Sequence, residues 1–282
     1  MNLLNKIGLG TVQFGQKYGI SNTTGVTPLS EISNILEYCS QKQINILDTA
    51  FGYGESEIKL GKNNLESFKI VSKFLPFKDT GLNIEQQLLK SLANLDQNSL
   101  YGYLAHRSLD VCENSEQWEE LNRLKSIGLV KKIGFSFNEP QELRALLEKK
   151  MIPDLIQVPY NFFDNRFAPG FLELKEKYNC EIHTRSVFLQ GLFFMKTSEL
   201  HSFFEPVKAE IQEVQKLGSS LASSLLKYAL SNENIDCVVF GVNSLAQLES
   251  NIEGLNKALI LDRPKNMSFN PDILTPSKWP TA

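Results

Sequence analysis

The sequence lacks the patterns that usually build metal, disulfide or redox sites. Its four cysteines stand singly without a CxxC pair, and its three histidines show neither HxH nor HxxxH spacing. Closely spaced ligands of this kind are how short motifs hold zinc or form a reactive dithiol. A chain of 282 residues can also bury a core large enough to need no disulfide staples. We therefore expect reduced thiols and no metal site.

Long apolar runs and clustered positive charge are also missing. No run approaches the roughly 18 apolar residues of a transmembrane helix. The first segment, MNLLNKIGLG, has no charged start, apolar run and small-residue cleavage site of a secretory signal. The formal net charge is −3 and the basic residues are dispersed, so no stripe could follow a phosphate backbone. These absences predict a cytoplasmic protein that binds neither nucleic acid nor a membrane.

The chain is rich in short β-branched or aromatic runs that alternate with longer amphipathic stretches. By length alone, two ordinary domains or one barrel of about 250 residues would both be admissible. The runs typical of buried strands number eight. They are residues 6–10, 44–50, 68–74, 100–106, 131–137, 155–160, 180–186 and 237–241.

Helical patterns separate these strands. They cover residues 30–42, 56–61, 84–95, 115–127, 140–150, 171–178, 219–230 and 244–257. Strict alternation implies parallel strands with right-handed crossovers, and the count of eight favours a closed (β/α)8 TIM barrel over an open doubly wound sheet. We predict one α/β domain over residues 1–282, with the barrel at about 6–258 and a tail at 259–282.

Two segments fall outside the alternation. The connection after the seventh strand, residues 187–218, is long and has its own helical pattern at 206–217. Long inserts of this kind commonly cover an active site. The proline-rich tail, which includes Trp279, suits an extended segment laid over the surface.

Reactive side chains gather where the predicted strands end, which is where barrels of this kind carry their chemistry. Asp48, Lys73 and His106 end the second, third and fourth strands, and Tyr53 follows the second. A nearby ammonium would lower the pKa of a tyrosine, a carboxylate would keep that lysine charged, and an imidazole could orient a substrate oxygen. Taken singly, each has an ordinary alternative as a turn former, a strand-end lysine or a core histidine; their joint occurrence favours chemistry.

The same residues lie in a series of motifs. DTAFGYGESE resembles the DTAxxYGxSE signature of the aldo-keto reductases, and IVSKF, YLAHRSLD, QVPYN and RSVFLQGL resemble later segments of that family in the same order. The resemblance runs from about Ile7 to Ala258. It implies reduction of an aldehyde or ketone, with sugar-derived carbonyls among the candidates, by hydride transfer from NADP(H) or NAD(H). Tyr53 would be the general acid, Lys73 and Asp48 would lower its pKa, and His106 would position the carbonyl.

The resemblance also implies a cofactor site. Ser136 and Gln157 would bond the nicotinamide carboxamide, Ser186 would meet the pyrophosphate, and the segment GVNSLAQLESN would hold the adenosine end. Arg185 replaces an aromatic residue that usually stacks on the nicotinamide, and its cation should favour the reduced cofactor. The full set is Gly10, Thr11, Asp48, Ser136, Gln157, Arg185, Ser186, Gly241, Asn243, Ser244, Gln247 and Asn251.

Two positions bear on the choice between NADP(H) and NAD(H). Gly241 and Gln247 stand where some family members carry a lysine and an arginine for the 2′-phosphate, so NADP(H) is expected with NAD(H) usable. A Rossmann site is not expected, because the next acid at a strand end after GLGTVQFG, Asp48, lies about 38 residues beyond Gly10 rather than roughly 20.

Two other functions stay open at this point. Some proteins of this fold are regulatory subunits that bind nicotinamide and turn over little, although the complete set of four reactive residues argues against that role. A barrel lyase could instead use Lys73 as a Schiff-base nucleophile. Asp48 would keep that lysine protonated and unreactive, which disfavours the lyase.

Overall fold

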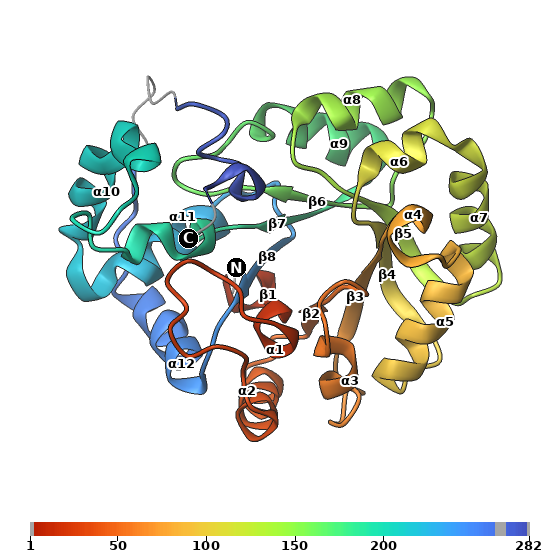
Figure 1. Cartoon of the computed structure of the whole chain (residues 1–282), viewed down its shortest axis with the longest axis horizontal. Coiled ribbons are helices and arrows are strands. Elements are labelled where there is room, and N and C mark those ends of the chain that lie inside the picture. The colour runs from red at the N-terminus through yellow and green to blue at the C-terminus, as the bar shows by residue number, and fades with distance from the viewer. Residues whose placement is uncertain (1–2, 263–268, 281–282) are drawn as a thin grey trace.

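The barrel predicted from the alternation is present. A computed structural model describes residues 3–262 and 269–280. Each strand pairs in parallel with its neighbours in chain order, and β8 pairs with β1 to close the barrel (Figure 1). The strands are β1 (Ile7–Gly10), β2 (Ile46–Asp48), β3 (Lys69–Phe74), β4 (Leu100–Ala105), β5 (Val130–Ser136), β6 (Leu155–Pro159), β7 (Glu181–Arg185) and β8 (Cys237–Gly241).

Helices surround the barrel and cover the outer face of its strands (Figure 1). Some begin with recognisable caps: Asn83 and Gln86 form a capping box at the start of α5, where each side chain accepts from the other residue's backbone N–H. The helices are α1 (Val12–Gly15), α2 (Leu29–Gln41), α3 (Ser56–Leu60), α4 (Phe77–Thr80), α5 (Ile84–Leu95), α6 (Ser108–Glu113), α7 (Ser115–Ser126), α8 (Pro140–Glu148), α9 (Phe171–Tyr178), α10 (Lys208–Gln215), α11 (Leu221–Leu230) and α12 (Leu245–Glu253). None of the helices in the described part of the chain is long and apolar enough to cross a membrane.

All eight predicted strands agree with the structure to within about two residues at either end. They were recognisable because strands covered on both faces read as short, nearly continuous apolar runs. The short helices α1, α4 and α6 were not predicted, since about one turn of helix carries no periodicity. The helix expected at 206–217 is divided into a 3₁₀ turn, η4 (Ser202–Val207), and α10.

Apolar side chains form two large clusters. The first lies between the barrel strands and the surrounding helices, with fully buried members such as Ile7, Phe135 and Ile156. The second joins the long connection after β7, α10 and the tail, and it includes Phe193, Ile211 and Trp279.

The tail contributes to this second cluster. Its residues 269–280 lie on the protein as turns and a short 3₁₀ helix, η7 (Pro276–Lys278). The Trp279 ring packs edge-on against Phe204 with centroids 4.9 Å apart, and its indole N–H donates to the Ile273 carbonyl at 2.9 Å. Residues 263–268 and 281–282 of the predicted tail lie outside the described residues.

The N-terminal end of the barrel holds a polar cluster centred on Glu181. The Tyr101 hydroxyl donates to Glu181 Oε2 at 2.6 Å, His183 Nε2 lies 2.6 Å from Oε1, and Lys132 forms an ion pair with the same carboxylate. Burial disfavours the ionised carboxylate, but the hydrogen bonds from His183, Lys132 and Tyr101 outweigh burial and hold the pKa of Glu181 below its usual value. This end of a barrel generally serves stability rather than catalysis.

We expect Glu181→Gln to lower the free energy of unfolding by about 1 to 3 kcal/mol at neutral pH, because the neutral amide leaves Lys132 without its partner. A carboxyl whose folded pKa is depressed stabilises the fold above its unfolded pKa, near 4.5, and this contribution is lost as pH falls further. Denaturant titrations at several pH values below neutral should therefore show a shallower acid loss in the variant. Glu213→Gln, in the exposed pair with Lys216, is the matched control and should change stability by less than about 0.5 kcal/mol. An unchanged acid profile in Glu181→Gln would contradict this account.

Candidate active site

A buried ion pair between Asp48 and Lys73 lies at the C-terminal end of the barrel. Lys73 Nζ donates to Asp48 Oδ1 at 2.8 Å and Oδ2 at 2.7 Å, and to the Thr49 carbonyl at 2.9 Å. The Lys73 side chain is 1% exposed and the Asp48 side chain is 5% exposed. Asp48 pairs with Val71 on β3, and alternation along the strand places Lys73 on the same face as Val71. Burial lowers the pKa of Lys73, while the Asp48 carboxylate opposes that effect.

Tyr53 reaches this pair from a tight loop after β2. Gly54 adopts a left-handed conformation with φ of 57°, and the backbone of Gly15 runs so close that an added Cβ would lie 1.7 Å from the Tyr53 carbonyl oxygen. Ser56 anchors the loop by donating to the carbonyl and hydroxyl oxygens of Thr11 at 2.9 Å each. Lys73 Nζ lies 5.2 Å from the centre of the Tyr53 ring. The predicted convergence of Asp48, Tyr53 and Lys73 is therefore present.

The direction of the pKa shift on Tyr53 differs from the expectation. Burial raises the pKa of Tyr53 well above its usual range, and the Asp48 carboxylate raises it further, with Arg185 opposing. Lys73 does not lower it below the usual value, because its charge is already matched by Asp48 at hydrogen-bond distance. Tyr53 is thus a protonated phenol at neutral pH, which is the form that can donate a proton.

His106 follows β4 and contacts Tyr53. The two rings meet edge to face, with centroids 5.7 Å apart and planes at 79°. Burial lowers the pKa of His106 to about 3, and the nearby Lys73, Arg185 and Arg107 contribute in the same direction. Nδ1 is buried and has no hydrogen-bond partner among the described residues. The imidazole is therefore neutral and keeps an uncommitted ring nitrogen.

Gln157 lies closer to the ion pair than the sequence indicated. Its Nε2 donates to Asp48 Oδ1 at 2.7 Å, so its amide nitrogen supports the carboxylate. Its Oε1 is buried without a partner among the described residues. Ser136 pairs with Gln157 in the register of β5 and β6, which places both at the same rim.

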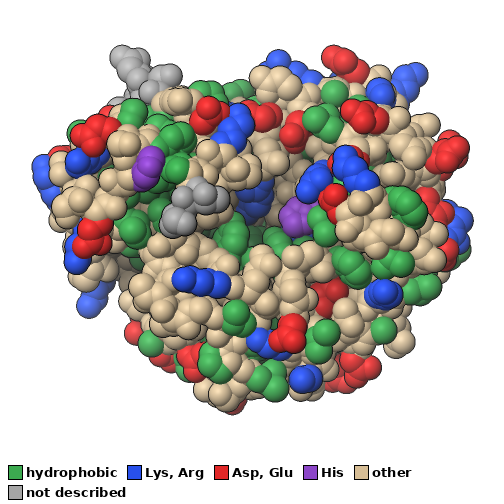
Figure 2. All heavy atoms as spheres, viewed as in Figure 1, with side chains coloured by type: hydrophobic (Ala, Val, Ile, Leu, Met, Phe, Trp, Pro, Cys, Tyr) green, Lys and Arg blue, Asp and Glu red, His purple; other side chains and the backbone are tan. Residues whose placement is uncertain are grey.

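A cavity of about 340 Å³ opens beside Tyr53 and runs toward α12. Figure 2 shows this face of the molecule hollowed near its centre, with a basic side chain inside the hollow and a histidine at its edge. Ten of the predicted site residues line the cavity. They are Gly10, Thr11, Asp48, Tyr53, Arg185, Ser186, Gly241, Asn243, Gln247 and Asn251.

The other predicted site residues do not line the cavity. Lys73 and Gln157 lie behind Asp48, and His106 contacts the cavity residue Tyr53. Ser136 is 4% exposed. The Ser244 hydroxyl accepts from the Gln247 N–H at 3.3 Å and so caps α12.

Comparison with known proteins identifies the family of this chain. The model of the aldo/keto reductase family matches residues 6–262, nearly the whole chain. The chain belongs to the aldo/keto reductase family. Members of this family are NAD(P)H-dependent oxidoreductases, so the protein is one of these enzymes.

Individual relatives of this aldo/keto reductase are distant. The uncharacterized oxidoreductase YqkF of Bacillus subtilis (strain 168) is 22% identical, covering 90% of this chain and 88% of the relative. The aldo-keto reductase AKR11C1 from Bacillus halodurans has a TM-score of 0.71 at 20% identity, over 91% of this chain and 88% of that one. An aldo-keto reductase from Klebsiella pneumoniae, solved in complex with NADPH, has a TM-score of 0.67 at 17% identity, over 93% of both chains. At these identities the two structural similarities show the shared barrel fold.

Sequence reasoning missed one wall of the cavity in this aldo/keto reductase. Two loops meet there: the Ile20 N–H donates to the Gln190 carbonyl at 3.0 Å, and Gln190 Nε2 donates to the Tyr18 hydroxyl at 3.0 Å. Gly191 fits against Ser21, whose Oγ would lie 1.9 Å from an added Cβ. Gly191 within the motif RSVFLQGL was the one available signal, because Tyr18 lies in a loop without periodicity.

The cavity suits a nicotinamide dinucleotide. Three buried amide oxygens, Gln13 Oε1, Gln157 Oε1 and Asn243 Oδ1, have no partner among the described residues and could accept from a bound molecule. An added Cβ on Gly241 would lie 2.3 Å from the Gln13 side chain, so Gln13 can lie against the end of β8 only because residue 241 is a glycine.

We expect Lys73→Met to lower the free energy of unfolding by about 3 to 5 kcal/mol, because it leaves Asp48 buried and unpaired. The double variant Asp48→Asn/Lys73→Met should recover part of that loss, since neither charge then remains. Lys78→Met, in the exposed pair with Asp110, is the control and should change stability by less than about 1 kcal/mol. Denaturant unfolding of the four proteins measures this, and a single-variant loss below about 1 kcal/mol would show that the pair is not energetically coupled.

Proposed function

We propose that this aldo/keto reductase reduces an aldehyde or ketone to an alcohol, with NADPH or NADH as the reductant and Tyr53 as the proton donor. The observation that carries the proposal is the meeting of a protonated phenol, a neutral imidazole and a closed ammonium–carboxylate pair at one end of the cavity. When bound, the reduced nicotinamide supplies a hydride to the carbonyl carbon. The chain's own residues then have to bind the carbonyl oxygen and give it a proton.

Tyr53 is suited to that proton transfer because its high pKa keeps the hydroxyl protonated until charge develops on the substrate oxygen. Once the proton has left, a phenolate remains. Arg185 acts on the phenol in the direction that favours its ionised form, whereas the charge of Lys73, whose Nζ lies 5.2 Å from the ring centre, is matched by Asp48. Arg185 therefore stabilises the product state of the transfer more than the resting phenol.

His106 would position the carbonyl. A neutral imidazole carries one N–H donor, and a donor aimed at the substrate oxygen stabilises the charge that develops there. The low pKa of His106 makes it a poor competitor for the role of general acid near neutral pH. Tyr53 and His106 thus have separate roles, one as donor of the proton and the other as a hydrogen-bond donor.

The dinucleotide would lie along the cavity with its nicotinamide near Tyr53. Gly10, Thr11, Arg185 and Ser186 line that end, and the unpaired Oε1 of Gln157 supports a carboxamide contact beside Ser136. The adenosine end would lie toward α12. Gly241, Asn243, Gln247 and Asn251 line that side, next to the capped start of the helix at Ser244.

We expect Tyr53→Phe to lower kcat for carbonyl reduction by about 10² to 10⁴, because general acid catalysis contributes about that much. The dissociation constant of NADPH, measured by fluorescence titration, should change by less than about threefold. Tyr18→Phe removes another cavity phenol and should reduce kcat by about tenfold or less. If Tyr53→Phe retained more than about a third of the turnover with chemistry rate-limiting, Tyr53 would not be the proton donor.

We infer that cofactor choice depends on the start of α12, because the described residues that line that end of the cavity include no lysine or arginine. The Asn243 N–H is taken by Gln247 Oε1 at 2.8 Å, and the Leu245 N–H is taken by the Glu31 carboxylate at 2.6 Å. A carboxylate already satisfies this helix terminus, which otherwise favours phosphate. We therefore propose that the enzyme discriminates weakly between NADPH and NADH.

Gln247→Arg should tighten NADPH binding by about 10- to 100-fold while changing NADH binding little, because a charge-assisted hydrogen bond to the 2′-phosphate is worth roughly 1.5 to 3 kcal/mol. In the unaltered enzyme the two dissociation constants should agree within about tenfold. Glu31→Gln is a second test and should favour NADPH without adding a cation. A preference for NADPH above about a hundredfold in the unaltered enzyme would mean that other groups hold the phosphate.

A further inference from the structure

Arg185 is a partly buried cation held in the cavity wall by neutral groups. Its Nη2 donates to the Phe137 carbonyl at 3.0 Å and to Asn138 Oδ1 at 2.6 Å, and its Nη1 donates to Ser186 Oγ at 3.2 Å. A guanidinium has five N–H donors, so these three bonds leave donors on Nη1 and Nε. Among the described residues, no carboxylate forms an ion pair with it.

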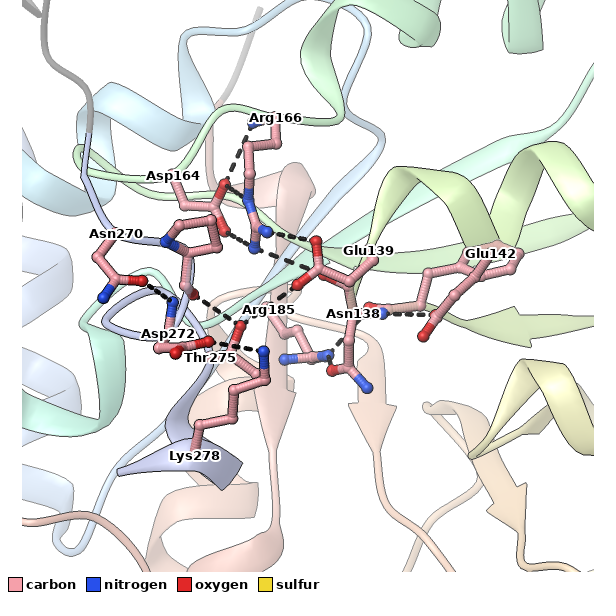
Figure 3. A network of polar contacts seen from close by, with 12 residues as sticks. Asn138, Glu139, Glu142, Asp164, Arg166, Arg185, Asn270, Asp272, Thr275 and Lys278 are labelled. Atoms are coloured by element: carbon pink, nitrogen blue, oxygen red, sulfur yellow. Dashed lines mark hydrogen bonds and ion pairs between the residues drawn. The ribbon is translucent and has the colours of Figure 1, made fainter. Parts of the chain in front are cut away.

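Carboxylates do lie close by, but they bind elsewhere (Figure 3). Glu139 and Asp164 both pair with Arg166, at 2.5 Å and 2.9 Å. Glu142 accepts from the Asn138 N–H at 2.9 Å and from the Ser108 hydroxyl at 3.1 Å. Arg166, Glu139 and Asp164 together carry one net negative charge, but neither carboxylate forms an ion pair with Arg185.

The end of the cavity beside Tyr53 is called the reacting end, and its other charges do not compensate Arg185. Asp48 is the only carboxylate among the described residues that line the cavity, and Lys73 already occupies both of its oxygens. His106 is neutral at physiological pH. The reacting end therefore carries a net positive charge of about one, and a desolvated, unpaired cation favours an anionic ligand.

We propose that the substrate is a carbonyl compound that also carries a carboxylate or phosphate, and that Arg185 binds this anionic group while Tyr53 and His106 hold the carbonyl oxygen. The proposal rests on the proposed function, since it names the substrate class of the same site. A fixed, planar guanidinium with donors to spare is suited to such an oxyanion.

The position of Arg185 favours the substrate over the cofactor phosphates as the source of the anion. Arg185 lines the cavity together with Tyr53 and is held by the Phe137 carbonyl just after β5, which places it at the reacting end. Its charge acts on Tyr53 and His106 there. The adenosine phosphate would lie toward α12. A substrate whose anionic group lies within a few bonds of its carbonyl would contact Tyr53 with the carbonyl oxygen and Arg185 with the anionic group.

The experiment compares charged and neutral forms of one carbonyl compound. Succinic semialdehyde and pyruvate are each measured against their methyl esters, and glyceraldehyde 3-phosphate against glyceraldehyde, which separates carboxylate from phosphate. With NADPH saturating, at least one anionic member should exceed its neutral partner in kcat/KM by about 10- to 100-fold. The ratio should fall toward one in Arg185→Met and recover partly in Arg185→Lys. Arg185→Met should also slow the neutral partner, because Arg185 acts on Tyr53, so the ratio of the two kcat/KM values is the quantity that tests the proposal.

Arg107→Met is the matched control, because Arg107 directly follows His106 but is exposed and paired with Asp79. It should leave the ratio within about twofold. Equal rates for charged and neutral members would overturn the proposal while leaving the carbonyl reductase function intact, whereas reduction of neither member would overturn the proposed function itself. A loss of NADPH affinity in Arg185→Met that matches the loss of kcat/KM would assign the cation to the cofactor and also overturn the proposal.

Discussion

The buried ion pair between Asp48 and Lys73 is the interaction on which the reacting end of the cavity depends. Two charges in a low-dielectric site cost several kcal/mol each to desolvate, and only good mutual geometry offsets that cost. The pair also organises its neighbours: Lys73 bonds the Thr49 carbonyl at the start of the Tyr53 loop, and Gln157 reaches across from β6 to the same carboxylate. These bonds join β2, β3 and β6 at one point, and the Tyr53 ring lies next to it.

A second feature of the rim is the contrast between two arginines. Arg166 binds two carboxylates and joins the loops after β5 and β6, while the tail contributes Thr275, whose hydroxyl lies 3.5 Å from Glu139 (Figure 3). Arg185 is fixed by a carbonyl, an amide oxygen and a hydroxyl. The first arrangement fixes two loops with one negative charge in excess, and the second fixes a cation without pairing it to a carboxylate. The two arginines therefore have different roles: Arg166 holds the loops together, and Arg185 presents its charge to the cavity.

The sequence was sufficient for the barrel because its evidence is local. Each strand is a short apolar run, and the meeting of Asp48, Tyr53, Lys73 and His106 at one end of the barrel follows from their places after such runs. The sequence could not show contacts and pKa shifts that depend on several segments of the chain at once. Tyr18 and Gln190 come together from two aperiodic loops. The amide of Gln157 donates to Asp48, which lies 109 residues earlier in the sequence. The raised pKa of Tyr53 likewise reflects burial that no single motif records.

The closure of the barrel bears on how the chain acquires its structure. Ile7 pairs with Val238 and Gly10 with Gly241, so the final seam joins segments from opposite ends of the folded region. During synthesis, β1 has a neighbour in β2 early but presents an open edge until β8 has emerged. Contacts of such sequence separation form slowly, and an unpaired edge in the meantime is a site for intermolecular association. Because Gly10 and Gly241 both line the cavity, the cavity itself is complete only after that last pairing, and a nascent chain cannot use a ligand bound there to stabilise its partial folds.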